Sequence, residues 1–190
     1  MGNQSDADAE TRIKPERRQE LEHHLKASPT DRDAYLELAV IYRVESRPLE
    51  AKRVLAQAHE LFPDDMTVLW ELEEATLARS LQQFREFSDL GKRLGTAEAD
   101  REVERSASDW AQRRIEICEA RLQRDPTLLH LHIARAEALM DAEHHEQAIS
   151  ELSPILHVDE HSSQAHFILG RALLALGHEA KAMAALRAAS

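Results

Sequence analysis

The sequence predicts an all-α fold, an α-solenoid of stacked two-helix repeats, and three observations lead to this prediction. The segment from His132 to Leu139 is echoed 34 residues later by the segment from His166 to Leu173. Apolar residues recur at spacings of three and four, which places them on one face of a helix. Only 5 of the 190 residues are glycine and 4% are aromatic, and no long stretch alternates apolar and polar residues as a strand would. A fixed period of this size indicates stacked helical units, which mostly present binding surfaces.

The chain begins with a polar, acidic segment, residues 1–13, which we predict to be a disordered tail. A helix follows from Pro15 to about Lys26, with Leu21 and Leu25 on one face. We expect this helix to cover the open apolar end of the stack, as the terminal elements of a solenoid must. Together with two repeats it forms an N-terminal region over residues 14–94.

Two repeats are predicted within this region, each as a pair of helices. The apolar residues of the first pair are Tyr35, Leu38, Ala39 and Tyr42, followed by Ala51, Leu55 and Ala58, and Pro63 ends the pair. The second repeat is degenerate. Its first helix carries Leu69, Leu72 and Ala75, and its second helix carries Phe84, Phe87, Leu90 and Leu94. Gly95-Thr96 then breaks the chain.

Residues 95–125 are predicted to form one long connecting helix, because residues 97–124 contain no glycine or proline. Threading this segment onto the repeat would place Arg101, Glu102 and Arg105 at core positions, where unpaired charge is costly. A break at residues 106–109 is the alternative. We expect a structural discontinuity near residues 95–125, with a sub-stack of repeats on either side.

Two further repeats are predicted over residues 126–190. Their apolar positions include Ala136, Leu139, Ala148 and Leu152, then Leu173, Ala182 and Leu186. No polar helix follows to cover Leu173 and Leu186, so we expect either further chain or a partner to cover this end.

These residues resemble the tetratricopeptide repeat, whose pattern is Trp-x2-Leu-Gly-x2-Tyr, then Ala-x3-Phe, then Pro. The residues of the first repeat that match it are Tyr35, Leu38, Ala39, Tyr42, Ala51, Leu55 and Pro63. The resemblance covers residues 32–94 and 127–190. It implies a right-handed superhelical stack, interrupted here by one long helix, and a concave groove in which the first helices of the repeats receive a peptide or a helix of another protein.

By this resemblance, several side chains are expected to line the groove. They are Glu37, Arg43, Trp70, Glu71, Glu74, His130, Glu137, Gln164, Phe167 and Arg171. Aromatic anchors with charged rims suit protein recognition. The alternative for each residue is a plain surface position or packing between repeats, and packing is the more common role for side chains such as Trp70 and Phe167. The carboxylates favour a neutral or basic ligand segment. Leu36 and Val40 stand where chaperone-binding members of the family use Lys and Asn, so that function is not implied.

The sequence therefore predicts a protein–protein interaction scaffold, with self-association through the C-terminal repeat as the alternative. A metal-binding or enzymatic protein is a third, weaker hypothesis. The chain has 11 histidines, but His132 and His166 share one repeat position, and His144 and His178 share another, which indicates packing or turn roles. No nucleophile elbow, phosphate loop or dinucleotide fingerprint is present, so no catalytic residue and no cofactor are predicted.

Charge and composition narrow the class of partner. A net charge of −11 disfavours nucleic acid, and no apolar run is long enough for a membrane span. The arginines between Arg101 and Arg124 alternate with acidic residues, which predicts a solvated helix face. The single cysteine, Cys118, lies on an apolar helix face beside Ile115 and is interpreted as a buried thiol in a reducing compartment, the cytoplasm.

Overall fold

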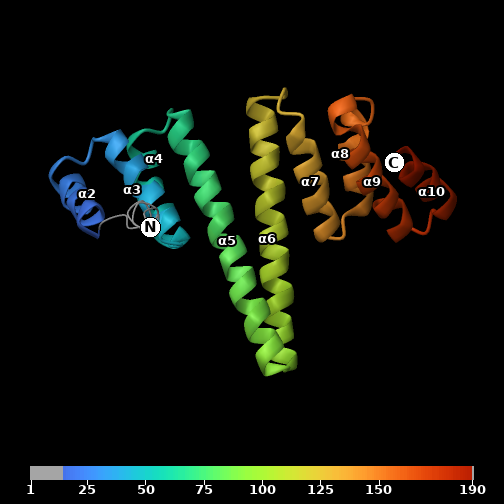
Figure 1. Ribbon diagram of the computed structural model, residues 1–190, viewed down its shortest axis with the longest axis horizontal. Coiled ribbons are helices and arrows are strands. Elements are labelled where there is room, and N and C mark those ends of the chain that lie inside the picture. Colours follow the sequence, from blue (N-terminus) through green and yellow to red (C-terminus); the bar gives the residue numbers. More distant parts are fainter. Residues whose placement is uncertain (1–14, 190) are drawn as a thin grey trace, which may run out of the picture. The chain divides into compact units, whose positions relative to one another are not determined.

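The computed structural model describes residues 15–189, and this part of the chain is helical without any β-strand, which confirms the all-α prediction. The tail predicted for residues 1–13 lies outside the described residues. The elements are α2 (Pro15–Ala27), α3 (Arg32–Val44), α4 (Pro48–Leu61), α5 (Met66–Leu94), α6 (Ala97–Arg124), α7 (His130–Asp141), α8 (His145–Leu152), the 3-10 turn η1 (Ser153–Ile155), α9 (Asp159–Ala175) and α10 (Glu179–Ala188) (Figure 1).

The chain divides into two compact units, and the division does not fall where the sequence predicted it. Unit 1 is Met1–Gln82 and unit 2 is Gln83–Ser190, so the boundary lies inside α5 rather than near residues 95–125. The long helix α6 belongs wholly to unit 2, where it packs on α7. The sequence placed the discontinuity near residues 95–125 because the segment before Gly95 was expected to fold back as a hairpin, whereas it is part of a single helix.

In unit 1, the helices begin at polar residues or at proline. The Asp31 carboxylate accepts a hydrogen bond of 3.1 Å from the Ala34 amide, which caps α3, and Pro48 occupies the first turn of α4. At the start of α5, Asp65 accepts bonds from the amides of Thr67 and Val68 at 2.9 and 3.0 Å. These caps satisfy amides that have no partner inside their helix.

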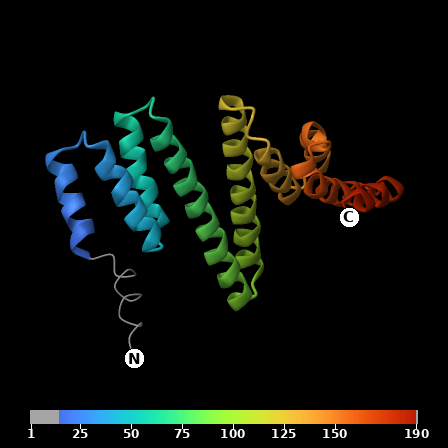
Figure 2. The same cartoon turned by 45° about the horizontal axis from the view of Figure 1, so that its top comes forward.

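The core of unit 1 is built on small residues between α3 and α4. Ala39, Ala51 and Ala58 are at most 1% exposed, so the two helices approach closely, and Leu55 fills the space beside them. Helix α2 lies beside α3 (Figure 2) and packs on it through Leu21 and Leu25. Val68 and Ala75 of α5 belong to the same buried cluster. This arrangement matches the close helix pairing predicted for the first repeat.

Three helix pairs are joined by one kind of turn. The residue after the helix cap has a left-handed backbone in each case: Ser46 (φ 58°), Glu143 (φ 61°) and Gly177 (φ 76°). The next amide donates to a carbonyl five residues back at 2.8 Å, from Arg47 to Tyr42, from His144 to Leu139 and from His178 to Leu173. This is the Schellman motif. His144 and His178 therefore share a turn role, which agrees with the interpretation of their common repeat position.

The second predicted repeat does not form a hairpin, because residues 66–94 are a single helix, α5, of 29 residues. Stepping 34 residues on from the buried Ala51, Leu55 and Ala58 gives Arg85, Asp89 and Lys92. All three are exposed in α5. A second helix carrying these charges at its core positions could not be buried, so the chain continues straight through Ser80, the position equivalent to the turn residue Ser46.

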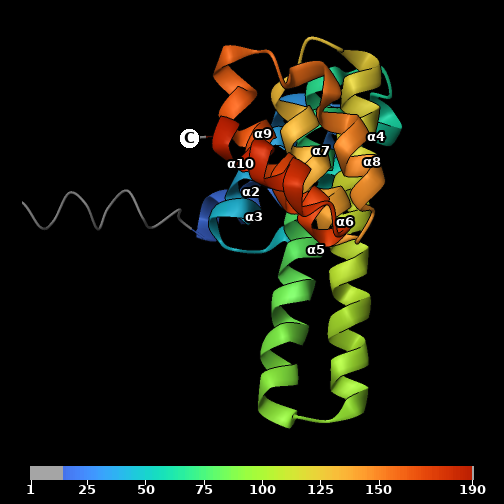
Figure 3. The same cartoon turned by 90° about the vertical axis from the view of Figure 1, so that its right-hand side faces the viewer.

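In unit 2, the last turns of α5 lie beside the first half of α6 (Figure 3). A side chain at Gly91 would come within 2.7 Å of Val103 Cγ2, so glycine permits the close approach of the two helices. Gly95, with φ 59°, reverses the chain, and Thr96 caps α6 through a 3.3 Å bond from the Ala99 amide.

Residues 97–124 form one helix, α6, with the bounds that the sequence predicts. Ala111, Ile115 and Cys118 are buried, and Ile115 packs against Ala138 and Leu139 of α7. Arg121 was assigned to a solvated face, and this was wrong, because its side chain is 5% exposed. It lies one turn after Cys118 and so shares the buried face of the helix.

The C-terminal half of unit 2 consists of the hairpins α7–α8 and α9–α10, and α9 packs on both helices of the preceding pair. Leu173 is 9% exposed and joins Ala182 and Ala185 in a small core. Leu186 packs against Gly170, where an added Cβ would lie 2.5 Å from Leu186 Cγ. The expectation that Leu173 lies uncovered was therefore wrong. Leu186 is half-buried, and the neighbouring Leu174 and Met183 are 47% and 50% exposed.

The two units repeat each other at an offset of 97 residues. Adding 97 to the residue numbers carries α2 onto the second half of α6, α3 onto α7, and α4 onto α8 with η1. The left-handed turn residues Ser46 and Glu143 differ by the same number, as do the fully buried Leu55 and Leu152. In unit 1, α3 thus packs between α2 and α4, and in unit 2 the equivalent helix α7 packs between α6 and α8.

Candidate functional site

The structure brings two of the predicted groove residues of unit 1 together. Arg43 of α3 forms an ion pair of 2.8 Å with Glu71 of α5. Glu74 is half-buried and also has an interaction partner. The carboxylates of this surface are therefore partly neutralised by other side chains of the protein, which weakens the argument that they select a basic ligand.

Glu37 is held by α2 rather than presented to a ligand. The Arg17 guanidinium donates to both of its carboxylate oxygens at 2.8 Å, from Nε and Nη2. This bidentate bond holds the pKa of Glu37 below its usual range. Glu37, predicted as a groove residue, thus connects α2 and α3. Its spacing within α3 could not predict this role.

Apolar side chains remain exposed among the predicted groove positions of α3 and α5. Val40 is 45% exposed, Val44 57% and Trp70 37%. Val44 was missed as a site residue, although its spacing of four from Val40 places it on the same helix face. Trp70 precedes Glu71, whose pairing with Arg43 brings this part of α5 next to α3. We name Val40, Val44 and Trp70 the apolar strip of unit 1.

In unit 2, the predicted residues form two contacts. Gln164 of α9 donates a 3.2 Å bond to Glu137 of α7, which joins the two helices on one face. The Arg171 guanidinium lies 5.9 Å from the ring centroid of Phe167, and Phe167 is 50% exposed. His130 is exposed at the start of α7 and takes no part in these two contacts.

Sequence reasoning missed that α6 contributes to the same face. Arg114 reaches Asp141 at 2.5 Å and Glu137 at 3.9 Å, and its guanidinium stands 5.3 Å from the Trp110 ring centroid. It had been assigned to a solvated stripe, but its side chain is only 17% exposed. Arg114 precedes Glu137 and Asp141 by 23 and 27 residues, so no short-range sequence pattern indicates these ion pairs. They depend on how α6 packs on α7.

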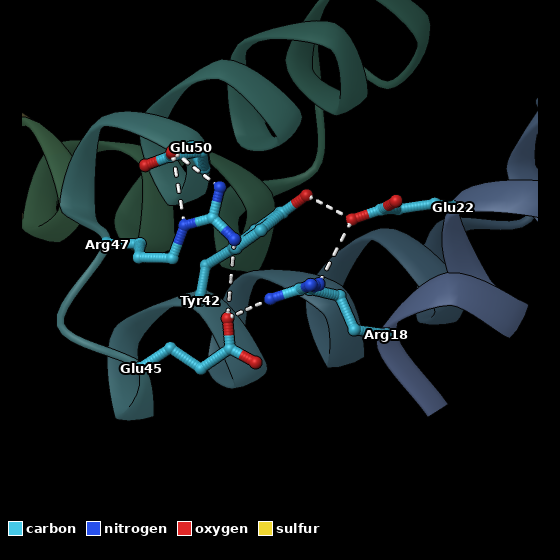
Figure 4. A network of polar contacts seen from close by, with 6 residues as sticks. All are labelled: Arg18, Glu22, Tyr42, Glu45, Arg47 and Glu50. Carbon is cyan, nitrogen blue, oxygen red and sulfur yellow. Dashed lines mark hydrogen bonds and ion pairs between the residues drawn. The ribbon is translucent and has the colours of Figure 1, made fainter. Parts of the chain in front are cut away.

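The opposite side of α3 carries a polar network that links three helices (Figure 4). The Tyr42 hydroxyl donates to Glu22 at 2.7 Å, and Arg18 donates to Glu45 at 2.5 Å. Arg47 lies over the Tyr42 ring at 5.1 Å and bonds Glu50 at 2.7 Å. Burial, with the bond to Glu22, raises the pKa of Tyr42 to about 12, so the phenol stays protonated and acts as a donor.

Next to this network is an open crevice of about 390 Å³ between α2, α3 and α4, which we name the unit 1 crevice. It is lined by Glu22, Leu25, Lys26, Tyr35, Leu38, Tyr42, Glu50, Arg53, Val54 and Gln57. Adding 97 to each number gives residues that all line two adjoining depressions in unit 2, between α6, α7 and α8. The crevice is therefore a repeated feature of the fold, with different side chains in each copy.

The described side chains provide little for metal or nucleophilic chemistry. Within residues 15–189, no group of three or more His, Cys, Asp and Glu side chains is placed to hold a metal ion. Burial raises the pKa of the Cys118 thiol, which keeps it protonated and weakly nucleophilic. No helix in this part of the chain is long and apolar enough to cross a membrane.

Comparison with known proteins adds no family to this description, because neither a protein-family model nor a curated protein matches the chain.

Proposed function

We propose that this chain is a helical-repeat scaffold of the tetratricopeptide type that binds a peptide or helix of another protein. The helix pairs, their common turn and the repetition at 97 residues support a right-handed stack of this type. The apolar strip of unit 1 is the observation on which the binding role depends. Three large apolar side chains are exposed on α3 and α5, and Arg43 and Glu71, which are adjacent in the chain to Val44 and Trp70, neutralise each other; such a surface suits a protein partner.

The chemistry of the partner follows from this surface. Arg43 with Glu71, and Arg17 with Glu37, leave little net charge beside the apolar strip. We therefore propose a neutral or weakly basic amphipathic segment that places apolar side chains against Val44 and Trp70. Nucleic acid and membrane are not proposed as partners, and the proposal includes no catalytic role or cofactor. A single buried cysteine supports a reducing compartment such as the cytoplasm.

Peptide selection tests the binding role. A random-peptide phage library is selected on the full chain, and the enriched sequences are titrated as labelled peptides by fluorescence anisotropy. We expect Val44→Glu and Trp70→Ala each to weaken a groove-binding peptide by at least about tenfold, as expected for a buried contact. Exposed Ala78→Glu, outside the apolar strip on α5, is the matched control. Equal binding by wild type, V44E and W70A would refute this site.

A second candidate, self-association, is favoured by the last hairpin of unit 2. Leu174 of α9 and Met183 of α10 are 47% and 50% exposed. Met183→Glu tests this candidate, whereas Leu186→Glu would disrupt the packing on Gly170. Light scattering coupled to size-exclusion chromatography, over a wide concentration range, separates the two candidates. A mass that stays monomeric in wild type excludes self-association, and a dimer that M183E abolishes supports it.

A further inference from the structure

The unit 1 crevice combines an apolar floor with two cations, Lys26 and Arg53. In the described part of the chain, only Arg53 of the two lies close enough to a carboxylate, that of Glu50, to add to the lowering of its pKa by Arg47. Leu25, Leu38 and Val54 form the floor and are at most 9% exposed. Lys26 and Arg53 line the same crevice and are exposed. Neither side chain makes a hydrogen bond or ion pair with any residue from 17 to 189.

The acidic residues of this crevice are already engaged. Glu22 accepts the Tyr42 hydroxyl at 2.7 Å and faces Arg18 Nε at 3.4 Å. Glu50 accepts from Arg47 at 2.7 Å (Figure 4). Together, the crevice and the adjoining network hold four cations (Arg18, Lys26, Arg47, Arg53) and three carboxylates (Glu22, Glu45, Glu50), a net charge of +1, although the whole chain carries a net charge of −11.

Unit 2 provides an internal comparison on an equivalent framework. Gln123 and Ser150 replace the two cations there, and Arg135 and Glu151 replace Leu38 and Val54. Arg135 bonds Glu151 at 2.9 Å and pairs with Glu119 at 3.4 Å, while His132 bonds Glu151 at 2.6 Å. These charged side chains pair with one another, although Arg135 Nε is buried without a hydrogen-bond partner. The apolar floor and the two cations of unit 1 are thus not required by the packing of such a helix triplet.

We propose that the unit 1 crevice binds an acidic peptide segment of a partner protein. An apolar side chain of the peptide packs on Leu25, Leu38 and Val54, and its carboxylates pair with Lys26 and Arg53. The volume of about 390 Å³ lies within the usual range for ligand pockets. Because the rest of the chain repels anions on average, the two cations fix where an acidic segment binds.

This site is separate from the apolar strip and has the opposite charge preference. Tyr35 and Leu38, which line the crevice, lie on one face of α3, and Val40 and Val44 lie on the other. The inference therefore does not depend on the proposed groove, and either binding role can fail alone.

Peptides from the same phage selection provide the probe. We expect one enriched class to contain an apolar residue flanked by Asp or Glu. The double variant K26E/R53E should weaken a labelled peptide of this class by at least about tenfold, since two attractive pairs become repulsive. Raising the salt concentration should weaken binding to wild type as well. The matched control is Q123E/S150E, which places the same charges at the equivalent positions of unit 2 and should leave the affinity unchanged.

Three results would overturn the proposal: no acidic class is enriched, K26E/R53E binds as wild type does, or Q123E/S150E weakens binding equally. A dimer in light scattering that K26E/R53E abolishes would assign the crevice to a second copy of the chain and would also overturn it. Circular dichroism melting checks the fold, and the neutral pair K26Q/R53Q, with an expected loss of about threefold, replaces K26E/R53E if that variant is unstable. Trp70→Ala should not affect this peptide class, which separates the crevice from the groove.

Discussion

At the residue scale, Gly170 shows how one missing side chain holds a helix pair together. A Cβ at this position would lie 2.5 Å from Leu186 Cγ and 3.3 Å from the Ala182 carbonyl oxygen. We expect Gly170→Ala to destabilise the protein by about 1–2 kcal/mol, because overpacking of about 1–3 kcal/mol exceeds the gain in helix propensity of about 1 kcal/mol. Urea denaturation measures this change.

The Leu186→Ala background is the control for this prediction. With the leucine side chain removed, only the 3.3 Å contact with the Ala182 carbonyl oxygen opposes the propensity gain, so Gly170→Ala should be clearly less destabilising there than in the wild-type background. A loss of the same size in both backgrounds would show that the contact with Leu186 is not the cause.

The charge state of Asp65 should affect the free energy of unfolding in the acid range. Hydrogen bonds from Arg32, and then from the Val68 amide, lower its pKa to about 2 from an ordinary value of 3.8. A depressed folded-state pKa gives stability that is complete above pH about 4 and is lost as the pH falls toward 2. Asp65→Asn should therefore be less stable than wild type at neutral pH, and the difference should vanish near pH 2.

Denaturation at a series of pH values measures this difference, and Asp64→Asn is its control. Asp64 is exposed and has no ion pair among the described residues. Its replacement should give only a small difference in stability, because it removes no ion pair. A pH-independent difference for Asp65→Asn would contradict the assigned ion pair with Arg32.

At the scale of elements, the three Schellman turns predict opposite effects of glycine at neighbouring positions. Ser46 and Glu143 have positive φ angles, which cost a residue with a side chain about 1–2 kcal/mol. Glycine avoids this cost but keeps only part of the gain, because its unfolded state has more conformational freedom. Ser46→Gly and Glu143→Gly should each stabilise by about 0.5–1 kcal/mol, and Gly177→Ala should destabilise by about 1 kcal/mol. Thermal denaturation compares them with Ala142→Gly, at φ −86°, which should be destabilising.

The same scale shows how much the sequence could predict. Helix pairs with small residues at core positions, such as Ala39 with Ala51, were predicted because their spacing alone fixes which face is buried. The straight course of α5 was missed because the stripe from Phe84 to Leu94 was given more weight than the charges at Arg85 and Asp89. That information was in the sequence, since a hairpin would have placed these charges in its core.

The candidate site was less predictable than the fold for a different reason. Glu37 and Glu137 lie at the expected helix positions, but Arg17 and Arg114 reach them from helices distant in sequence. Which cation meets which carboxylate depends on helix packing, and helical periodicity carries no information about it. The crevice was missed because Lys26 of α2 and Arg53 of α4 come together only when these two helices pack on either side of α3.

At the scale of the whole molecule, the repetition at 97 residues allows one perturbation to be made twice. Leu55 and Leu152 are equivalent, and both are fully buried, the first in the core of unit 1 and the second in that of unit 2. Replacement by alanine should cost about 2–5 kcal/mol at either site. In repeat proteins each element depends chiefly on its neighbours, so we expect each loss to stay within its own unit.

Hydrogen exchange measured by mass spectrometry tests this expectation, and α5 gives the most direct readout because the boundary at Gln82 lies inside it. Leu55→Ala should increase exchange in residues 66–82 and leave residues 83–94 protected, whereas Leu152→Ala should do the reverse. An unbroken helix would then report two different stabilities along its length. Equal loss of protection over the whole of α5 in both variants would instead mean that the two units unfold as one, and that the helix transmits the damage across the boundary.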